Sequence, residues 1–339
     1  MSQRALRIAT RSSPLALWQA EDVAHSLRAY HPGLVVELVR VETLGDRSQQ
    51  ARTPLHLLGG QGVFVKEVQA AVLRGDADIA VHSAKDLPSG DADGLVIAAF
   101  TRRDDVRDGL VGSTLDALPD GATVATGSVR RRAQLAGLRP DLNFVELRGN
   151  MHTRVARAAE PGIDAVVVGC AGLDRLGMGH LVDERLAPRV MVPQVSQAAI
   201  AVECRTDDHK TVRVLTMVDR ADIRPGLLAE RAFLARLGSG CELPVGALAT
   251  VMGDGDEWLL EGLIASFDGA TVLRRSVRGQ APGLRQDRPV HLDLRVRRQE
   301  RPGRHLDLER EGREHEDRPV RAEGAARRRL PPPRPRRLP

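Results

Sequence analysis

Short apolar runs alternate with stretches of helical periodicity over residues 1–200, and this alternation restricts the chain to an α/β fold. The run at 6–10 is typical of a buried strand. It precedes a helical stretch at 14–30, where Pro14 occupies a position that helix starts tolerate. Another strand is expected at 34–41. Such a pattern predicts sheets whose strands are joined by helices.

The pattern continues to residue 205 and then changes. We expect further strands and helices at 63–74 (helix), 78–82, 122–127, 129–138 (helix), 143–149, 153–159 (helix), 163–169 and 199–205. The last strand is a candidate to return to the first sheet. A helical stretch at 227–237 opens a third region, whose three strand-like runs are separated by the turn signals DGD and FDG. This indicates a small antiparallel sheet that carries a helix.

Charge divides the chain near residue 281. The formal net charge is +5, yet residues 282–339 hold 17 arginines and 10 acidic residues, which leaves 33 basic and 35 acidic residues before them. The body is therefore near neutral. The segment 282–339 has no Phe, Trp, Tyr, Ile, Met or Cys and is rich in Arg, Pro, Glu and Gly. This composition cannot build a core and predicts a disordered tail.

The composition also argues against several classes of protein. Aromatic residues make up only 2%, too few for a surface that stacks on single-stranded nucleic acid. No apolar run reaches the roughly 20 residues that span a bilayer, and the N-terminus lacks the apolar stretch of a secretory signal. Cys170, Cys204 and Cys241 show no metal-ligand spacing, and their low number suits a reducing compartment. We therefore expect a cytoplasmic protein without a metal, membrane or nucleic-acid partner.

Five arginines lie just after expected strand ends or in first helical turns: Arg11, Arg130, Arg131, Arg148 and Arg154. Open α/β sheets bind ligands at the carboxyl ends of their strands, where helix N-termini also favour anions. Arginine adds planar, bidentate recognition of carboxylates. For any one of them, an ordinary surface charge in an Arg-rich protein is an equal alternative. Together they predict a cleft for a ligand with several carboxylates.

Two other segments can carry chemistry. In HSAKDLP, Asp86 lies beside Lys85 at a strand end, where a carboxylate can stabilise a developing cation or shuttle a proton. Its alternative role is to cap a loop, and His82 fits a packed strand residue better than a base. In GSGCELPVG, the glycine-rich loop presents Cys241 as an attachment point or nucleophile. A buried structural role fits Cys170 and Cys204 better.

Eight collinear motifs from about residue 6 to residue 280 resemble the hydroxymethylbilane synthase (porphobilinogen deaminase) family. They are RIATRSSPLALWQA, GVFVKE, DIAVHSAKDLP, ATGSVRRRAQL, LRGNMHTR, AGLDRLG, ECR and GCELPVGA. The resemblance implies two α/β domains of the periplasmic-binding-protein type II around a cleft, at 1–102 with 199–219 and at 103–198. It also implies a small α+β domain at 220–281 that carries the cofactor.

The resemblance further implies a transferase of tetrapyrrole (porphyrin, haem) biosynthesis, active as a monomer. It would join four porphobilinogens head to tail on a covalent dipyrromethane primer, releasing ammonia and 1-hydroxymethylbilane. Cys241 would hold the primer as a thioether, and Asp86 would be the catalytic residue. The residues implied in cofactor binding are Lys85, Ser128, Arg130, Arg131, Arg148 and Gly149. Those implied in substrate binding are Arg11, Ser13, Arg154 and Gln197.

The sequence departs from the family pattern in four places. Gly127 replaces a hydroxyl residue, and Ser196 and Ala198 replace the glycines of the usual Gly-Gln-Gly. Gln61 replaces a common lysine, and the match ends near Gln280, where the family continues with an apolar helix. A reading-frame shift in a GC-rich gene is our preferred explanation of the tail, and a natural extension is the alternative.

Three readings of function compete. The first is the transferase. The second is a catalytically impaired homologue or a cytoplasmic anion-binding protein, because the C-terminal domain is altered. The third treats the arginine-rich tail as a nucleic-acid arm, but the acidic residues dispersed in it argue against that. The Cys241 loop favours the enzyme.

Overall fold

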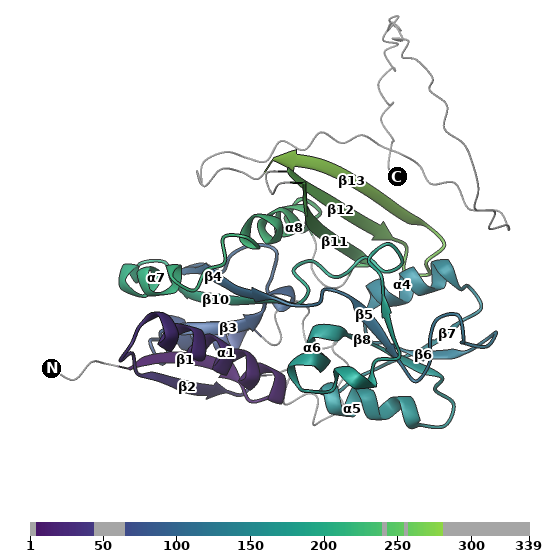
Figure 1. The fold of residues 1–339 in the computed structure, drawn as a ribbon, viewed down its shortest axis with the longest axis horizontal. Helices are drawn as coiled ribbons and strands as arrows, with labels where there is room; N and C mark the ends of the chain where they lie inside the picture. The colour runs from purple at the N-terminus through teal and green to yellow at the C-terminus, as the bar shows by residue number, and fades with distance from the viewer. Residues whose placement is uncertain (1–4, 44–64, 239–242, 254–256, 281–339) are drawn as a thin grey trace, which may run out of the picture. The chain divides into compact units, whose positions relative to one another are not determined.

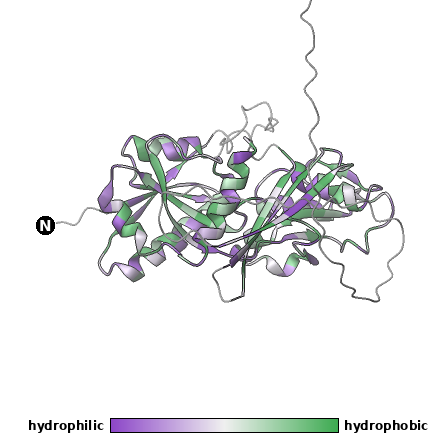
Figure 2. Cartoon of the chain, turned by 90° about the horizontal axis from the view of Figure 1, so that it is seen from above, coloured by the Kyte–Doolittle hydropathy of each residue, from purple (hydrophilic) through white to green (hydrophobic). Residues whose placement is uncertain are grey.

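The computed structural model describes residues 5–43, 65–238, 243–253 and 257–280. Gln61, Cys241 and the segment 282–339 lie outside these ranges. Within them the chain forms three β-sheets flanked by helices (Figure 1). Hydrophobic residues run along the strands, whereas the helices combine hydrophobic and hydrophilic faces (Figure 2). The apolar runs in the sequence thus correspond to strands, and the stretches of helical periodicity correspond to helices that pack one face on a sheet.

The first sheet has the strand order β2-β1-β3-β10-β4. Its strands are β1 (Leu6–Arg11), β2 (Val36–Val41), β3 (Ile79–Ser83), β4 (Leu95–Arg103) and β10 (Ala199–Arg205). It carries the helices α1 (Pro14–Tyr30), α3 (Lys66–Leu73) and α7 (His209–Thr216). β1 pairs in parallel with β2 and β3, whereas β10 lies antiparallel between β3 and β4. The expected return of strand 199–205 to the first sheet is confirmed.

The second sheet has the order β7-β6-β8-β5-β9. Its strands are β5 (Asp108–Val111), β6 (Thr123–Ala125), β7 (Asn143–Val145), β8 (Ala165–Gly169) and β9 (Glu184–Leu186). Its helices and turns are α4 (Val129–Leu138), α5 (Met151–Ala156), η3 (Arg157–Ala159), α6 (Cys170–Arg175) and η4 (Gly179–Leu181). In each sheet the fourth strand in this order, β10 in the first and β5 in the second, is the only one that runs antiparallel to the other four. This repetition agrees with two α/β domains of the periplasmic-binding-protein type II.

The third sheet is a simple antiparallel meander of β11 (Val245–Met252), β12 (Glu257–Ala265) and β13 (Val272–Gln280). Helix α8 (Arg224–Arg236) packs on one face, where Leu234 joins Val245, Ala247 and Leu260 in a small hydrophobic core. The predicted small sheet with a helix is therefore correct.

Helix starts follow the sequence closely. The Ser13 side chain accepts a hydrogen bond from the Ala16 amide at 3.3 Å, and Pro14 occupies the first turn of α1. The Ser128 side chain likewise accepts from the Arg131 amide at the start of α4, at 3.4 Å. Each cap satisfies an amide that has no partner inside its helix. The caps explain where both helices begin. Both helices also have the predicted bounds, 14–30 and 129–138.

Glu230, on α8, joins the first sheet, the third sheet and the segment before β10 through one buried carboxylate. Its side chain is 0% exposed. It pairs with Arg103 at the end of β4 at 2.9 Å, and it accepts hydrogen bonds from the Ser196 and Ala249 amides, each at 2.8 Å. A buried charge is tolerated only when such partners are all present. The carboxylate therefore ties the first sheet, the third sheet and the segment between β9 and β10 together.

The segment that leads into β10 contains two residues with left-handed backbone. Ser196 has a φ of 59° and Ala198 a φ of 68°, at the two positions where the family pattern has glycine. A side chain in this region costs about 1–2 kcal/mol relative to glycine. The Ser196 hydroxyl is also buried and has no hydrogen-bond partner among the described residues. These substitutions therefore place strain on either side of Gln197.

Replacing Ser196 by glycine should relieve both costs. We expect Ser196→Gly to raise the free energy of unfolding by about 1 kcal/mol in urea titrations, after allowing for the larger backbone entropy of glycine in the unfolded state. Ala199→Gly is the matched control, because Ala199 lies in ordinary strand β10 and its replacement should lower stability by about 1 kcal/mol. A loss of stability in both variants would refute the strain.

Candidate active site

The turn after β3 carries the first two candidate residues. β3 ends at Ser83, and the 3₁₀ turn η2 (Ala84–Asp86) follows directly, so Lys85 and Asp86 both lie at a strand's carboxyl end. Both side chains are half-buried. Burial lowers the pKa of Lys85 against the opposing charge of Asp86, and the charge of Arg131 lowers it further. Lys85 thus lies close to a second cation.

His82 belongs to a different, structural environment. It is 6% exposed, and its Nε2 lies 3.1 Å from Glu203 Oε2 on the neighbouring strand β10. Gln69 on α3 donates two hydrogen bonds to the same carboxylate, at 2.9 and 3.1 Å. Burial raises the pKa of Glu203, but the interaction with His82 and the hydrogen bonds from Gln69 outweigh it and lower that pKa. His82 is a packed strand residue, as expected.

Arg130 and Arg131 share a carboxylate that sequence reasoning did not find. Arg130 Nη2 donates to Asp108 Oδ2 at 2.7 Å, and Arg131 Nη2 donates to Asp108 Oδ1 at 2.8 Å. Gln197 Nε2 donates to the same Oδ1 at 3.0 Å. Asp108 is 0% exposed, and although burial opposes its ionisation, the two arginines and these hydrogen bonds lower its pKa to about 2. Asp108 therefore positions three candidate residues at once.

The loop after β7 and helix α5, which follows it, carry Arg148, Gly149 and Arg154. Arg154 on α5 donates from Nε to the carbonyl of Gly149 at 2.8 Å, and Gly149 has a φ of 98° that favours glycine. Burial and the charge of Arg131 lower the pKa of Arg154 to about 10, with a smaller effect of Arg11. Arg148 is less involved, because it is half-exposed and pairs with Glu146 at 3.3 Å.

The candidate cations converge at the end of β8. A Cβ atom added to Gly169 would lie 3.5 Å from Arg131 Nη2, 3.8 Å from Lys85 Nζ and 4.0 Å from the Gln197 side chain. We call Lys85, Arg131, Arg154 and Arg11 the cationic cluster, because, besides burial, the charges of Arg131 and Arg154 lower the pKa of Lys85, and those of Arg131 and Arg11 lower the pKa of Arg154. They come from η2, α4, α5 and the end of β1. The cluster therefore draws on both α/β sheets, at the carboxyl ends of their strands.

The remaining candidates are Ser13, Ser128, Gln197 and Cys241. Ser13 and Ser128 serve as helix caps, and Gln197 buries its amide on Asp108 and on the Val106 carbonyl at 2.7 Å. The Gln197 Oε1 atom is buried and has no hydrogen-bond partner among the described residues. Cys241 lies outside the described ranges, between the end of α8 and the start of β11 in sequence.

The departure at Gly127 has a steric cause. A Cβ atom there would lie 2.6 Å from the Leu147 carbonyl oxygen. A serine at this position would therefore require the backbone at Leu147, in the loop after β7, to move. The effect of Gln61 lies outside the described residues.

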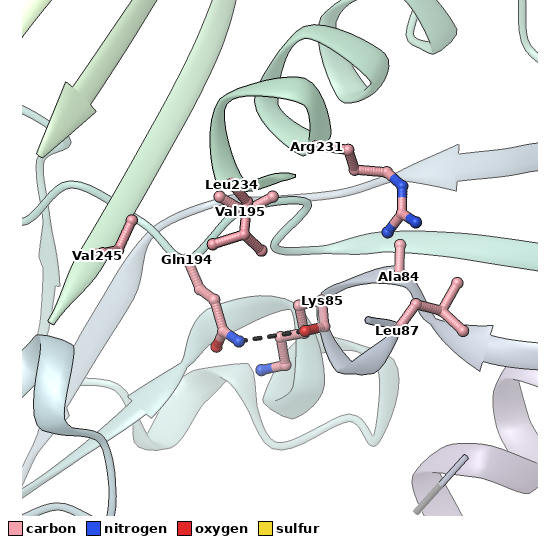
Figure 3. Close-up of a pocket in the computed structure, with 8 residues that line it drawn as sticks. All are labelled: Ala84, Lys85, Leu87, Gln194, Val195, Arg231, Leu234 and Val245. Atoms are coloured by element: carbon pink, nitrogen blue, oxygen red, sulfur yellow. Dashed lines mark hydrogen bonds between the residues drawn. The ribbon is translucent and has the colours of Figure 1, made fainter. Parts of the chain in front are cut away.

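A small pocket adjoins the Asp86 turn (Figure 3). Its lining residues are Ala84, Lys85, Leu87, Gln194, Val195, Arg231, Leu234 and Val245. Gln194 Nε2 donates to the Lys85 carbonyl at 3.2 Å, and Arg231 reaches the pocket from α8. The pocket thus brings the turn beside the helix that precedes the Cys241 loop in sequence.

Comparison with known families identifies this arrangement. The model of the porphobilinogen deaminase dipyrromethane cofactor-binding domain matches residues 6–213, and the model of the porphobilinogen deaminase C-terminal domain matches residues 226–297. The chain belongs to the porphobilinogen deaminase family. The second match extends past the boundary that the sequence analysis put at residue 281, into residues outside the described ranges.

Individual members of the porphobilinogen deaminase family are similar over most of this chain. The porphobilinogen deaminase of Trichlorobacter lovleyi is 43% identical over 281 residues, which are 82% of this chain and 89% of that protein. The one from Roseiflexus sp. is 46% identical over 86% of this chain and 93% of that protein. Among solved structures, the VFT2 domain of BvgS from Bordetella pertussis covers 69% of this chain and 92% of its own, at 19% identity and a TM-score of 0.39. The assignment rests on the sequence matches.

The cationic cluster suits the cofactor named by the matching family model. A dipyrromethane with carboxylate side chains needs several cations, and here burial, together with repulsion from the charge of Arg131, lowers the pKa of Lys85 and of Arg154. Carboxylates bound among them would relieve that repulsion.

Among the described residues, no helix is long and apolar enough to cross a membrane, and no acidic, His or Cys cluster could hold a metal ion.

Removing the charge of Asp108 should destabilise the protein strongly. Asp108→Asn leaves two buried guanidinium groups without a counter-charge, and we expect a loss of about 3–5 kcal/mol in the free energy of unfolding, measured in urea. Asp105→Asn is the matched control. Burial opposes ionisation of Asp105, but its bonds to Arg107 and Arg185 also lower its pKa to about 2; its side chain, however, is 20% exposed. That variant should lose only about 1 kcal/mol. Equal losses would mean that burial of Asp108 contributes nothing.

Proposed function

We propose that this chain is a hydroxymethylbilane synthase, which joins four porphobilinogens head to tail with loss of one ammonia at each addition. Water then releases the linear tetrapyrrole, 1-hydroxymethylbilane. The observation that carries the proposal is the convergence of Lys85, Arg131 and Gln197 at Gly169, beside the turn that holds Asp86. Family membership supports the same activity.

The cationic cluster would bind the acidic side chains of the pyrroles. Each porphobilinogen carries an acetate and a propionate group, so a growing chain gains two carboxylates at every addition. Arg131 and Arg154 offer planar guanidinium groups at the carboxyl ends of strands, and Lys85 adds a point charge. Arg11 and Arg148 would extend this surface, and the buried Asp108 would keep Arg131 oriented.

Asp86 would act on the reacting pyrrole. Positive charge develops near a pyrrole nitrogen when porphobilinogen loses ammonia and again when a new C–C bond forms. A fixed carboxylate close to that nitrogen stabilises charge that is greater in the transition state than in the ground state. Asp86 suits this role because its turn follows a buried strand directly, which places it at the carboxyl end of that strand.

Cys241 would hold the cofactor. Burial raises the pKa of the Cys170 thiol to about 12 and of the Cys204 thiol to about 11, so neither forms a thiolate readily. The dipyrromethane, once bound to Cys241, would supply the pyrrole terminus to which porphobilinogens are joined. The residues that would surround it are Lys85, Ser128, Arg130, Arg131, Arg148 and Gly149, with Arg11, Ser13, Arg154 and Gln197 toward the substrate.

We further propose three domains, at 1–102 with 199–219, at 103–198 and at 220–281. The three sheets support these bounds to within one residue, because each draws its strands from one of the three ranges except that β4 ends at Arg103, one residue past the first bound. Two buried, unpaired thiols, Cys170 and Cys204, suit a cytoplasmic location. The monomeric state is a prediction from the family resemblance.

The attachment of the cofactor to Cys241 can be tested by intact-mass spectrometry. The intact mass of freshly purified protein should exceed its sequence mass by one dipyrromethane, and Cys241→Ser should abolish the excess. Cys204→Ala is the matched control and should retain it, because the Cys204 thiol is buried in β10. An active protein without added mass would contradict the proposal.

The role of Asp86 predicts a loss of rate with little loss of binding. Asp86→Asn should retain the cofactor mass and lower kcat for porphobilinogen consumption about 100-fold or more, as lost electrostatic stabilisation does. Asp93→Asn makes the same change at an exposed position of the following loop and should leave kcat unchanged. Wild-type turnover by the Asp86 variant would reduce Asp86 to a loop residue.

A further inference from the structure

Arg231 is a buried arginine to which the sequence motifs assigned no role. It lies on α8 and is only 6% exposed. Its Nη2 donates a hydrogen bond to the carbonyl of Pro88 at 2.9 Å, two residues after Asp86. In the pocket view its guanidinium group points toward Ala84 and Leu87 (Figure 3). Arg231 therefore connects α8 to the Asp86 turn.

The charges around Arg231 favour that orientation. Burial lowers the pKa of Arg231, and the carboxylates of Asp91 and Glu203 oppose this effect. The Asp91 carboxylate lies 3.8 Å from Arg231 Nη2. The guanidinium group is thus kept charged by carboxylates on the loop after the turn and on strand β10. A buried arginine costs several kcal/mol unless such partners and hydrogen bonds are present, so its position is tightly specified.

The Asp86 turn needs restraint from outside. The hydrogen bond that closes the turn, from the Leu87 amide to the Ala84 carbonyl, is long, at 3.3 Å. Two side chains from elsewhere hold its carbonyls: Gln194 binds that of Lys85 at 3.2 Å, and Arg231 binds that of Pro88. An isolated 3₁₀ turn is weakly stable, because its hydrogen-bond geometry is poor. The location of the Asp86 carboxylate thus depends on these two contacts.

We propose that Arg231 is a positioning residue for the reaction: it ties the Asp86 turn to α8 and so fixes the carboxylate relative to that helix, which precedes Cys241 in sequence. α8 ends five residues after Arg231, and Cys241 follows ten residues after Arg231 in sequence. The inference rests on the proposed function. It goes beyond that function because it assigns to the third domain a part in placing a catalytic group of the first.

Arg224 provides a matched comparison on the same helix. Its Nη2 donates to the Ala98 carbonyl on β4 at 2.8 Å, and its Nε pairs with Asp219 at 2.6 Å. It therefore also ties α8 to the first α/β domain, but away from the turn. Arg224→Met and Arg231→Met remove the same kind of contact, so they separate general stability from placement of Asp86.

The first measurement is hydrogen exchange of the full-length protein, which does not depend on turnover. Arg231→Met should increase exchange of the amides in residues 84–91 about 10-fold, which corresponds to about 1.4 kcal/mol of lost restraint. Arg224→Met should leave exchange of this segment as in the wild type. Unchanged exchange in Arg231→Met, or an equal increase in both variants, would overturn the proposal.

The second measurement is steady-state kinetics with porphobilinogen on protein whose cofactor mass has been verified. Arg231→Met should lower kcat about 10- to 100-fold with KM within about 2-fold, because a small misplacement of a catalytic group affects the transition state most. Arg231→Lys should recover part of kcat, because an ammonium group can donate to the Pro88 carbonyl. Arg224→Met should retain kcat.

These arms distinguish the inference from the proposed function. A wild-type protein that does not consume porphobilinogen would refute the function, while the exchange data would still decide whether Arg231 restrains the turn. Active wild type with normal kcat in Arg231→Met would refute the positioning role alone.

Discussion

The buried carboxylate of Glu230 is the contact on which the remaining geometry depends. It is satisfied only when Arg103, the Ser196 amide and the Ala249 amide all reach it, and an unsatisfied buried charge would cost several kcal/mol. Because these partners come from the end of β4, the segment before β10 and the third sheet, the interaction selects one mutual placement of the parts. The active-site candidates Lys85 and Gln197 lie next to the segments held in this way, which explains how a site made from several sheets keeps a defined shape.

Charge balance then determines what the site can bind. Asp108 neutralises one of the two arginines that contact it, and Arg131 and Lys85 lie close to each other at the end of β8. The fold therefore stores electrostatic repulsion that an anionic ligand can relieve. A pre-arranged cluster of this kind would bind carboxylates without further reorganisation, which is the feature that electrostatic catalysis requires.

Sequence periodicity predicted most of the fold because long elements with regular patterns were involved. Helices α1 and α4 and strand β10 have the predicted bounds, since serine caps, Pro14 and a continuous apolar run mark them. Strands β5 and β9 are four and three residues long, too short for periodicity to register, and helix α7 and strand β4 were also missed. At the site, the positions of the arginines after expected strand ends and in first helical turns singled them out, and the motif resemblance implied their roles, but Asp108 and Arg231 were not foreseen. Their partners lie 22 to 143 positions away in sequence, and no local pattern encodes such contacts.

The place of β10 in the first sheet has a consequence for how the chain is made. β3 and β4 do not pair with each other; β10 lies between them, and it follows β4 only after the whole second sheet. On the ribosome, both strands must therefore present open edges until residues 199–205 emerge, and open edges invite pairing with other chains. The second sheet draws all its strands from one continuous stretch, so it can close earlier. During synthesis from the N-terminus, the second sheet should thus form before the first. The strands of the first sheet should stay incompletely paired, and accessible to chaperones, until β10 has been made.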